Sequence, residues 1–264
     1  MNIYPKLSNT IKYIANEIKH ILLNIKAKQG RPNKYSYELL LTGIIYKLKT
    51  GVPWRLLPSY YGSGTNVHRL MTILSNNDAF KNIWNTFILN CASFNDLIID
   101  CSLIKSPIGA IKGYTNRLFK NQSYSKVSLI CNEYKIPISL KVVEGTLHDS
   151  MILNNNIDDI ISNGINVLNK NLIADRGYYD NKTFKLCNKY KLNAHICRKK
   201  RALFEYKNKF VNNVNENTNK NRVKIEHMFA TLKQNKSITL NYSKKINIFY
   251  NLIYLSFILL HICR

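Results

Sequence analysis

Three acidic residues lie in apolar segments, where carboxylates are uncommon. Asp100 closes the run Leu97–Asp100, and Asp175 closes the run Asn171–Asp175. Glu226 lies in the segment RVKIEHMFATLK, whose apolar residues recur at helical spacing, so we expect it on or beside the apolar face of a helix. A carboxylate taken out of water is costly unless a cation compensates it. These acids are therefore candidates for a functional site.

Carboxylate oxygens are the ligands that Mg²⁺ prefers, and a bound Mg²⁺ ion keeps positions open for phosphate. Short apolar runs that end in Asp are typical of buried strands with a carboxylate at the tip. Acids far apart in sequence could then converge, which gives the hypothesis of a metal site formed by Asp100, Asp175 and Glu226. Taken singly, Asp100 and Asp175 could instead be capping or turn residues after a strand.

The charge balance points to a polyanionic partner. The 264 residues include 39 Lys and Arg against 15 Asp and Glu, a formal net charge of +24. Nucleic acid is the commonest partner for such a chain, and an acidic membrane surface is the alternative. A hydrophobic content of 45% excludes a disordered chain, and the length allows one large domain or a small domain joined to a larger one.

Neither the cysteines nor the apolar segments indicate an extracellular or membrane protein. The six Cys show no spacing suited to zinc and are expected to be reduced thiols of a cytoplasmic protein. No signal peptide is recognised. Residues 246–262 are apolar, but Asn247, Asn251 and His261 interrupt them, so we predict a buried helix and no membrane partner.

The first part of the chain has the periodicity of short helices. We expect them over residues 8–26, 35–50, 66–74 and 78–89, with Thr65 as the N-cap of the third. This predicts a small all-helical domain over residues 1–92. The third helix carries His68 and Arg69 after a Gly-containing turn, which suits a helix-turn-helix DNA-binding domain. A plain helical bundle with solvated basic residues is the alternative.

From residue 97 the pattern changes to alternating strands and helices. We predict strands over 97–102, 126–131, 136–143, 171–175 and 192–197, and helices over 149–161, 181–190, 222–233 and from about 245. This order predicts an α/β domain over residues 93–264, with a mixed sheet in which the first strand can lie beside the fourth. Asp149 is most simply a helix N-cap, whereas His148 could line a site.

Several strings together resemble one family. They are Gly30-Arg31-Pro32, TGVPWRLLP over residues 50–58, GSGT over 62–65, IIDCSLIKS around Asp100, LIADRGYYD around Asp175, and RVKIEHMFATLK around Glu226. Over nearly its whole length the chain resembles the small DDE transposases of bacterial insertion sequences. The resemblance implies an RNase H-like catalytic domain, a mixed sheet flanked by helices, preceded by the helical DNA-binding domain.

The resemblance also implies a reaction, and the three acids suit it. Asp100 would bridge two Mg²⁺ ions about 4 Å apart, with Asp175 on one ion and Glu226 on the other. Mn²⁺ would be able to substitute for Mg²⁺. The enzyme would nick DNA at the ends of the element and join the freed 3′-hydroxyl to target DNA. The implied partners are double-stranded DNA, as terminal inverted repeats and as target, and a second copy of the chain.

Basic residues are candidates for phosphate contacts. Arg222 and Lys233 lie four residues before and seven residues after Glu226, as in the family signature; a solvated helix edge is the alternative. The densest basic cluster is Arg198, Lys199, Lys200 and Arg201. It predicts contacts with the DNA backbone that carry no sequence information, although such runs are usually just solvated.

One position departs from the family pattern. The signature usually has a Tyr three residues before the Arg, and this chain has Asn219 there. The departure bears on DNA positioning and not on the metal ligands. It leaves open a catalytically silent descendant that only binds DNA, and an RNase H-like nuclease without strand transfer is a third alternative.

Overall fold

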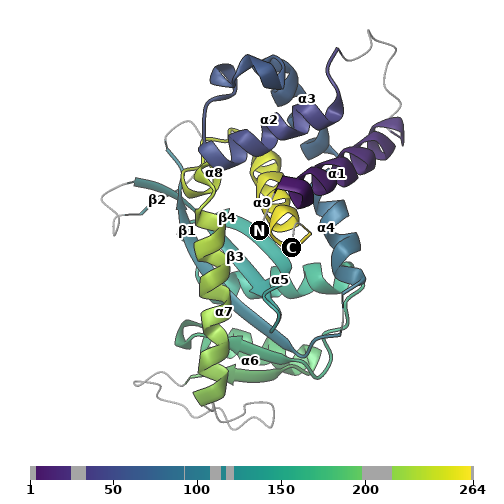
Figure 1. Ribbon diagram of the computed structural model, residues 1–264. Helices are drawn as coiled ribbons and strands as arrows, with labels where there is room; N and C mark the ends of the chain where they lie inside the picture. Colours follow the sequence, from purple (N-terminus) through teal and green to yellow (C-terminus); the bar gives the residue numbers. More distant parts are fainter. Residues whose placement is uncertain are drawn as a thin grey trace. The chain divides into compact units, whose positions relative to one another are not determined.

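The structure, a computed structural model, describes residues 4–24, 34–91, 93–107, 114–116, 122–197 and 216–262 (Figure 1). The described residues form two compact units. Residues 4–87 and 232–262 make the helical unit, and residues 88–231 make the sheet unit.

The helical unit is built from both ends of the described chain. Its elements are α1 (Tyr4–Asn24), α2 (Tyr37–Thr50), the 3₁₀ turns η1 (Trp54–Leu56) and η2 (Ser59–Tyr61), α3 (Gly64–Asn76), most of α4 (Ala79–Leu89), α8 (Lys236–Thr239) and α9 (Ile246–His261). The four predicted N-terminal helices and the predicted C-terminal helix are confirmed. The short helix α8 and the two 3₁₀ turns are too short to leave a periodic pattern in the sequence.

The limits of α2 and α3 follow from their caps. Ser36 caps α2 by accepting a hydrogen bond from the Leu39 amide at 3.2 Å, and Gly51 ends the helix with a φ of 73°. The N-cap of α3 is Ser63 and not the predicted Thr65, because the Ser63 hydroxyl accepts from the Asn66 amide at 3.3 Å. The helix therefore begins at Gly64, two residues earlier than predicted.

Helix α9 packs with the N-terminal helices. Its buried Asn251 accepts a hydrogen bond from the Phe80 amide at 3.2 Å, and Asn247 donates to the Asn76 side chain at 2.7 Å. The sequence pattern predicts a single domain over residues 93–264, whereas packing places α8 and α9 in the helical unit. The functional division at residues 92 and 93 stays a prediction.

The sheet unit has a mixed six-stranded sheet. Its strands are β1 (Asp96–Lys105), β2 (Tyr114–Asn116), β3 (Gln122–Cys131), β4 (Pro137–Glu144), β5 (Asn171–Ala174) and β6 (Asn193–Ile196). The order is β4-β3-β1-β5-β6, and β2 pairs with the first residues of β3. Strands β1, β3 and β4 are antiparallel, while β1, β5 and β6 are parallel. The predicted mixed sheet, with its first strand beside the fourth, is confirmed.

Helices cover both faces of this sheet. They are α5 (Asp149–Ser162), α6 (Asn181–Tyr190) and α7 (Glu216–Lys233), and the 3₁₀ turn η4 (Arg176–Tyr178) follows β5. On one face Ser128 of β3 donates to Asn156 of α5 at 3.0 Å. On the other face Asn221 of α7 donates to Asp96 of β1 at 3.1 Å, and α7 lies across these strands (Figure 1). The central strands are buried on both sides, which explains their apolar runs.

Candidate active site

Asp100 and Asp175 lie on neighbouring parallel strands. The β1–β5 register pairs Ile98 with Ile173, and the same offset places Asp100 beside Asp175. Paired residues of adjacent strands lie about 5 Å apart and point to the same face of the sheet. That face is the one covered by α7, because Asp96, on the same side of β1 as Asp100, bonds to Asn221. The structure thus brings two of the three predicted acids together.

The two acids occupy different positions along their strands. Asp175 directly follows β5, as predicted, and its Oδ1 accepts a hydrogen bond from the Gly177 amide at 2.6 Å. Asp100 lies within β1 and not at its tip. The strand continues because β1 stays paired with β3 as far as Lys105 opposite Tyr124.

Several groups act on the carboxylate of Asp100. Burial is the largest effect, and it raises the pKa of Asp100 from its ordinary 3.8 to about 6. The Cys101 amide, which donates to Asp100 Oδ1 at 2.8 Å, and the Arg222 guanidinium lower that pKa. Nearby Asp175 and Asp149 raise it further. Three carboxylates therefore interact electrostatically here.

Helix α7 brings Arg222 to this group. Arg222 interacts electrostatically with Asp100, and its Nε is buried without a hydrogen-bond partner among the described residues. Glu226 lies one helical turn further on, and residues four apart on a helix have Cβ atoms about 6 Å apart. Glu226 is exposed, so of the two expected positions, on or beside the apolar face, its side chain takes the one beside it. Ile225, Met228 and Phe229 form the buried face instead.

The acid pair fits a divalent cation. Two adjacent carboxylates supply the hard oxygen donors that Mg²⁺ prefers, and the charge of Asp175 is among the effects that raise the pKa of Asp100. Within the described parts of the chain, however, no three His, Cys, Asp or Glu side chains come close enough to hold one ion. Glu226 would have to complete the site from the adjacent turn of α7.

Asp149, the third of these carboxylates, is held by an ion pair that the sequence did not indicate. It forms an ion pair with Lys126 of β3 at 2.7 Å, and Lys126 also donates to the Leu147 carbonyl. Asp149 is the first residue of α5, and the cap is His148, whose Nδ1 accepts from the Ser150 amide at 3.4 Å. Only strand pairing places Lys126 here, because nothing in its local sequence distinguishes it from other lysines.

A side-chain contact lies behind the two acids, on the α5 face. The Cys101 thiol and the Tyr178 hydroxyl are 3.3 Å apart, which joins β1 to the turn after β5. Burial raises the pKa of the Cys101 thiol to about 12, so it stays a neutral thiol. The strand pairing between β1 and β5 ends at Ile98 and Ile173, before the acids, so this contact is the next link between the two segments. The sequence analysis treated Cys101 only as a reduced thiol.

The remaining predicted residues are placed as follows. His68 and Arg69 are exposed on α3 in the helical unit, and Lys233 is exposed at the end of α7. Residues 198–201, the basic cluster, lie outside the described residues, as does the side chain of Asn219. The five described cysteines lie outside disulfide bonds, in keeping with the expected reduced thiols.

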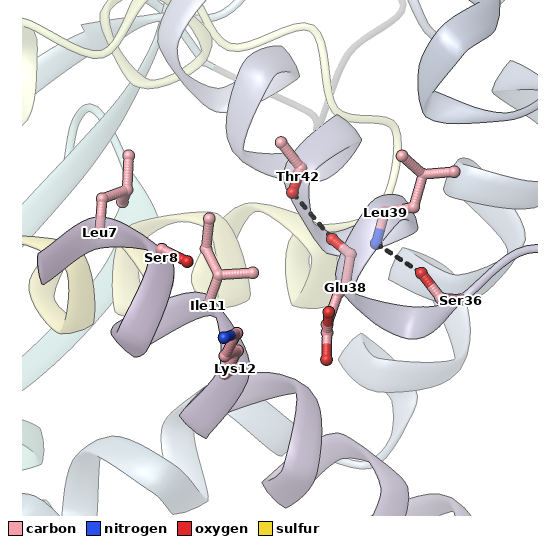
Figure 2. A pocket seen from close by; sticks show the side chains of 8 residues that line it. All are labelled: Leu7, Ser8, Ile11, Lys12, Ser36, Glu38, Leu39 and Thr42. Atoms are coloured by element: carbon pink, nitrogen blue, oxygen red, sulfur yellow. Dashed lines mark hydrogen bonds between the residues drawn. The ribbon is translucent and has the colours of Figure 1, made fainter. Parts of the chain in front are cut away.

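The described pockets do not coincide with this site. A cavity of about 410 Å³ lies between α1 and α2, where Figure 2 shows Lys12 and Glu38 among apolar and hydroxyl side chains. A second, of about 480 Å³, is lined by residues that include His148, Asp180 and Lys182 in the sheet unit. Neither cavity is lined by Asp100, Asp175 or Glu226.

Comparison with family models gave two matches. A model described as a "transposase of IS4/5 family" matches residues 16–84, and one described as "Transposase DDE domain" matches residues 94–262. The second match spans Asp100, Asp175 and Glu226. None of the curated proteins compared with the chain matches it.

Among solved structures, a cryo-EM piggyBac transposase synaptic complex with hairpin DNA is similar, at a TM-score of 0.48 and 11% sequence identity. The match covers 93% of this chain and 69% of that one. Among the described residues, no helix combines the length and apolar character needed to cross a membrane.

Proposed function

The chain belongs to the family of DDE transposases, and we propose that Asp100, Asp175 and Glu226 are its catalytic and metal-binding acids. Family membership confirms the predicted activity, DNA strand cleavage and strand transfer, and the predicted α/β catalytic fold preceded by a helical region. Transposase DDE domains generally use divalent metal ions.

The observation that carries the residue assignment is the Asp100–Asp175 pair. The β1–β5 register places both carboxylates on one face of the sheet, and neighbouring carboxylates help to raise the pKa of Asp100. Such a pair is destabilising when ionised and alone, and it becomes favourable when a cation lies between the two groups. We propose two Mg²⁺ ions, with Mn²⁺ as a substitute, held by this pair and by Glu226.

Each residue has a distinct task in this proposal. Bound Mg²⁺ would activate the attacking oxygen and stabilise charge on the scissile phosphate. Asp175 is held in place by the Gly177 amide, so its second oxygen is free to bind a ligand. Among the described residues the buried Arg222 Nε has no hydrogen-bond partner, and in this proposal the guanidinium contacts Glu226 one turn away or a DNA phosphate.

The DNA partners in this proposal are the terminal inverted repeats of the element and the target DNA. The protein would act as a homodimer on DNA. The basic residues outside the metal site, His68 and Arg69 on α3 and Lys233 at the end of α7, would contact DNA, together with the cluster at residues 198–201.

A cleavage assay tests the residue assignment. The protein is incubated with Mg²⁺ and a labelled duplex that carries the inverted repeats flanking its gene, beside Asp100→Ala and the control Glu144→Ala. Glu144 is an exposed acid at the end of β4. We expect nicked and joined products from the wild type and the control, and none from Asp100→Ala, with DNA binding nearly unchanged.

The outcomes separate the alternatives. Equal activity in the wild type and Asp100→Ala would reject the metal-site assignment. Nicks without joined product would indicate a nuclease, and DNA binding without any cleavage by the wild type would indicate a silent descendant.

A further inference from the structure

Helix α3 has one exposed face. Its buried residues are Val67, Leu70, Met71, Leu74 and Ser75. Thr65, His68, Arg69 and Asn76 are exposed, and their positions at i, i+3, i+4 and i+11 place them along one side of the helix. This exposed face carries one arginine, one histidine and no acid.

The segment before α9 runs beside this face. At the end of α3, Asn247 donates a hydrogen bond to Asn76 at 2.7 Å. Near the start of α3, partial burial and then the Lys245 ammonium lower the pKa of His68, so Lys245 is within electrostatic range of that ring. Lys244 and Lys245 are both exposed. Two lysines from the C-terminal part of the chain therefore flank a helix from the N-terminal part.

The His68 ring is supported from behind. Its centroid lies 5.3 Å from that of Trp54, and the Lys47 ammonium lies 5.7 Å from the centroid of the Trp54 ring. Burial lowers the pKa of Lys47 to about 8, and its Nζ donates to the Gly51 carbonyl at 3.1 Å. These contacts fix the position of His68 relative to the helical unit.

The charge of the surroundings favours an anionic partner. None of residues 232–264 is acidic, and residues 1–87 contain only Glu17, Glu38 and Asp78 as acids. Helix α9 begins at Ile246, directly after the two lysines, and the N-terminal end of a helix carries partial positive charge. Positive potential at the edge of a reading helix is the pattern expected for contacts with phosphates.

We propose that Lys244 and Lys245 and the exposed face of α3 form one surface for double-stranded DNA, in which the two lysines contact backbone phosphates beside the groove that α3 enters. This inference rests on the proposed function. It adds to the DNA-binding surface a segment that is far from the N-terminal helices in sequence. The lysines contribute affinity and orientation, while His68 and Arg69 face the bases.

The test measures binding by fluorescence anisotropy over a range of salt concentrations. It uses two labelled duplexes, one with the element end and one of scrambled sequence. The double variant Lys244→Ala/Lys245→Ala is compared with the wild type and with Lys12→Ala/Lys19→Ala, which removes two exposed lysines from α1 of the same unit. Circular dichroism checks that the variants fold.

We expect the Lys244→Ala/Lys245→Ala variant to bind both duplexes more weakly by the same factor, with its salt dependence reduced by about two released counterions. The wild type should then lose about tenfold more affinity than the variant between about 50 and about 200 mM salt. Arg69→Ala should instead reduce the preference for the element end.

Three results would overturn the inference. They are an unchanged affinity and salt slope in the double variant, an equal loss in the α1 control, and a changed sequence preference without a change in slope. If the wild type binds neither duplex, the proposed function fails as well. If the wild type binds DNA but the two lysines have no effect, only the lysine assignment fails.

Discussion

Asp100→Asn should make the metal-free protein more stable. Burial raises the pKa of Asp100 from 3.8 to about 6. A carboxyl with a raised pKa in the folded state favours folding only while it is protonated. Its contribution is fully present below pH 3.8 and is lost as the pH rises through about 6. At pH 8 the ionised group therefore destabilises the wild type by about 3 kcal/mol, at about 1.4 kcal/mol per pKa unit.

Asparagine keeps the acceptor for the Cys101 amide and removes the charge, so the variant should recover most of that energy. The assay is urea unfolding followed by far-UV circular dichroism in EDTA, from pH 4 to pH 8. The difference between variant and wild type should grow from near zero at the acid end to about 3 kcal/mol at pH 8. Glu144→Gln, an exposed control, should stay within about 0.5 kcal/mol of the wild type.

Added Mg²⁺ should reverse the ranking, because a ligand that binds only the folded wild type stabilises it by mass action. A variant that is less stable than the wild type at pH 8 in EDTA would refute the electrostatic reasoning. A stability difference that does not change with pH would refute it too.

Three further substitutions have expected outcomes. Gly177→Ala would place a Cβ 2.7 Å from Asp175 Oδ1, so the carboxylate must move. The protein should fold with nearly unchanged thermal stability, while DNA cleavage should fall at least about tenfold. Gly64→Ala would drive a Cβ into the Trp54 carbonyl at the start of α3. The free energy of unfolding, measured by thermal unfolding, should fall by more than about 2 kcal/mol, and an unchanged value would contradict the close approach. Tyr178→Phe removes the hydroxyl that contacts the Cys101 thiol. The variant should need a higher Mg²⁺ concentration for half-maximal thermal stabilisation. Equal Mg²⁺ titrations of variant and wild type would show that the contact does not position the acids.

The sheet could be predicted from sequence because its strands are buried on both faces and read as apolar runs. The predicted α6 has the observed limits, Asn181–Tyr190, since Asp180 is a strong N-cap whose side chain accepts from the Thr183 amide at 2.8 Å. The neighbouring positions of Asp100 and Asp175 also followed from the order of strands.

Other features depend on tertiary pairing and left no local signal. The exposure of Glu226 could not be read from the helical pattern, since a residue beside the apolar face turns inward or outward according to what packs there. The Lys126–Asp149 ion pair required the register of β3 and the start of α5. The packing of α9 beside α3 depends on contacts between residues about 171 positions apart, such as Asn76 and Asn247.

That long-range packing has a consequence for synthesis on the ribosome. The amide of Phe80 meets its buried acceptor, Asn251, 171 residues further along the chain, only after α9 has been translated. Nascent chains that stop early would lack α9 and leave the apolar side of α3 without its cover. Translation through α9 is thus a condition for a finished helical unit.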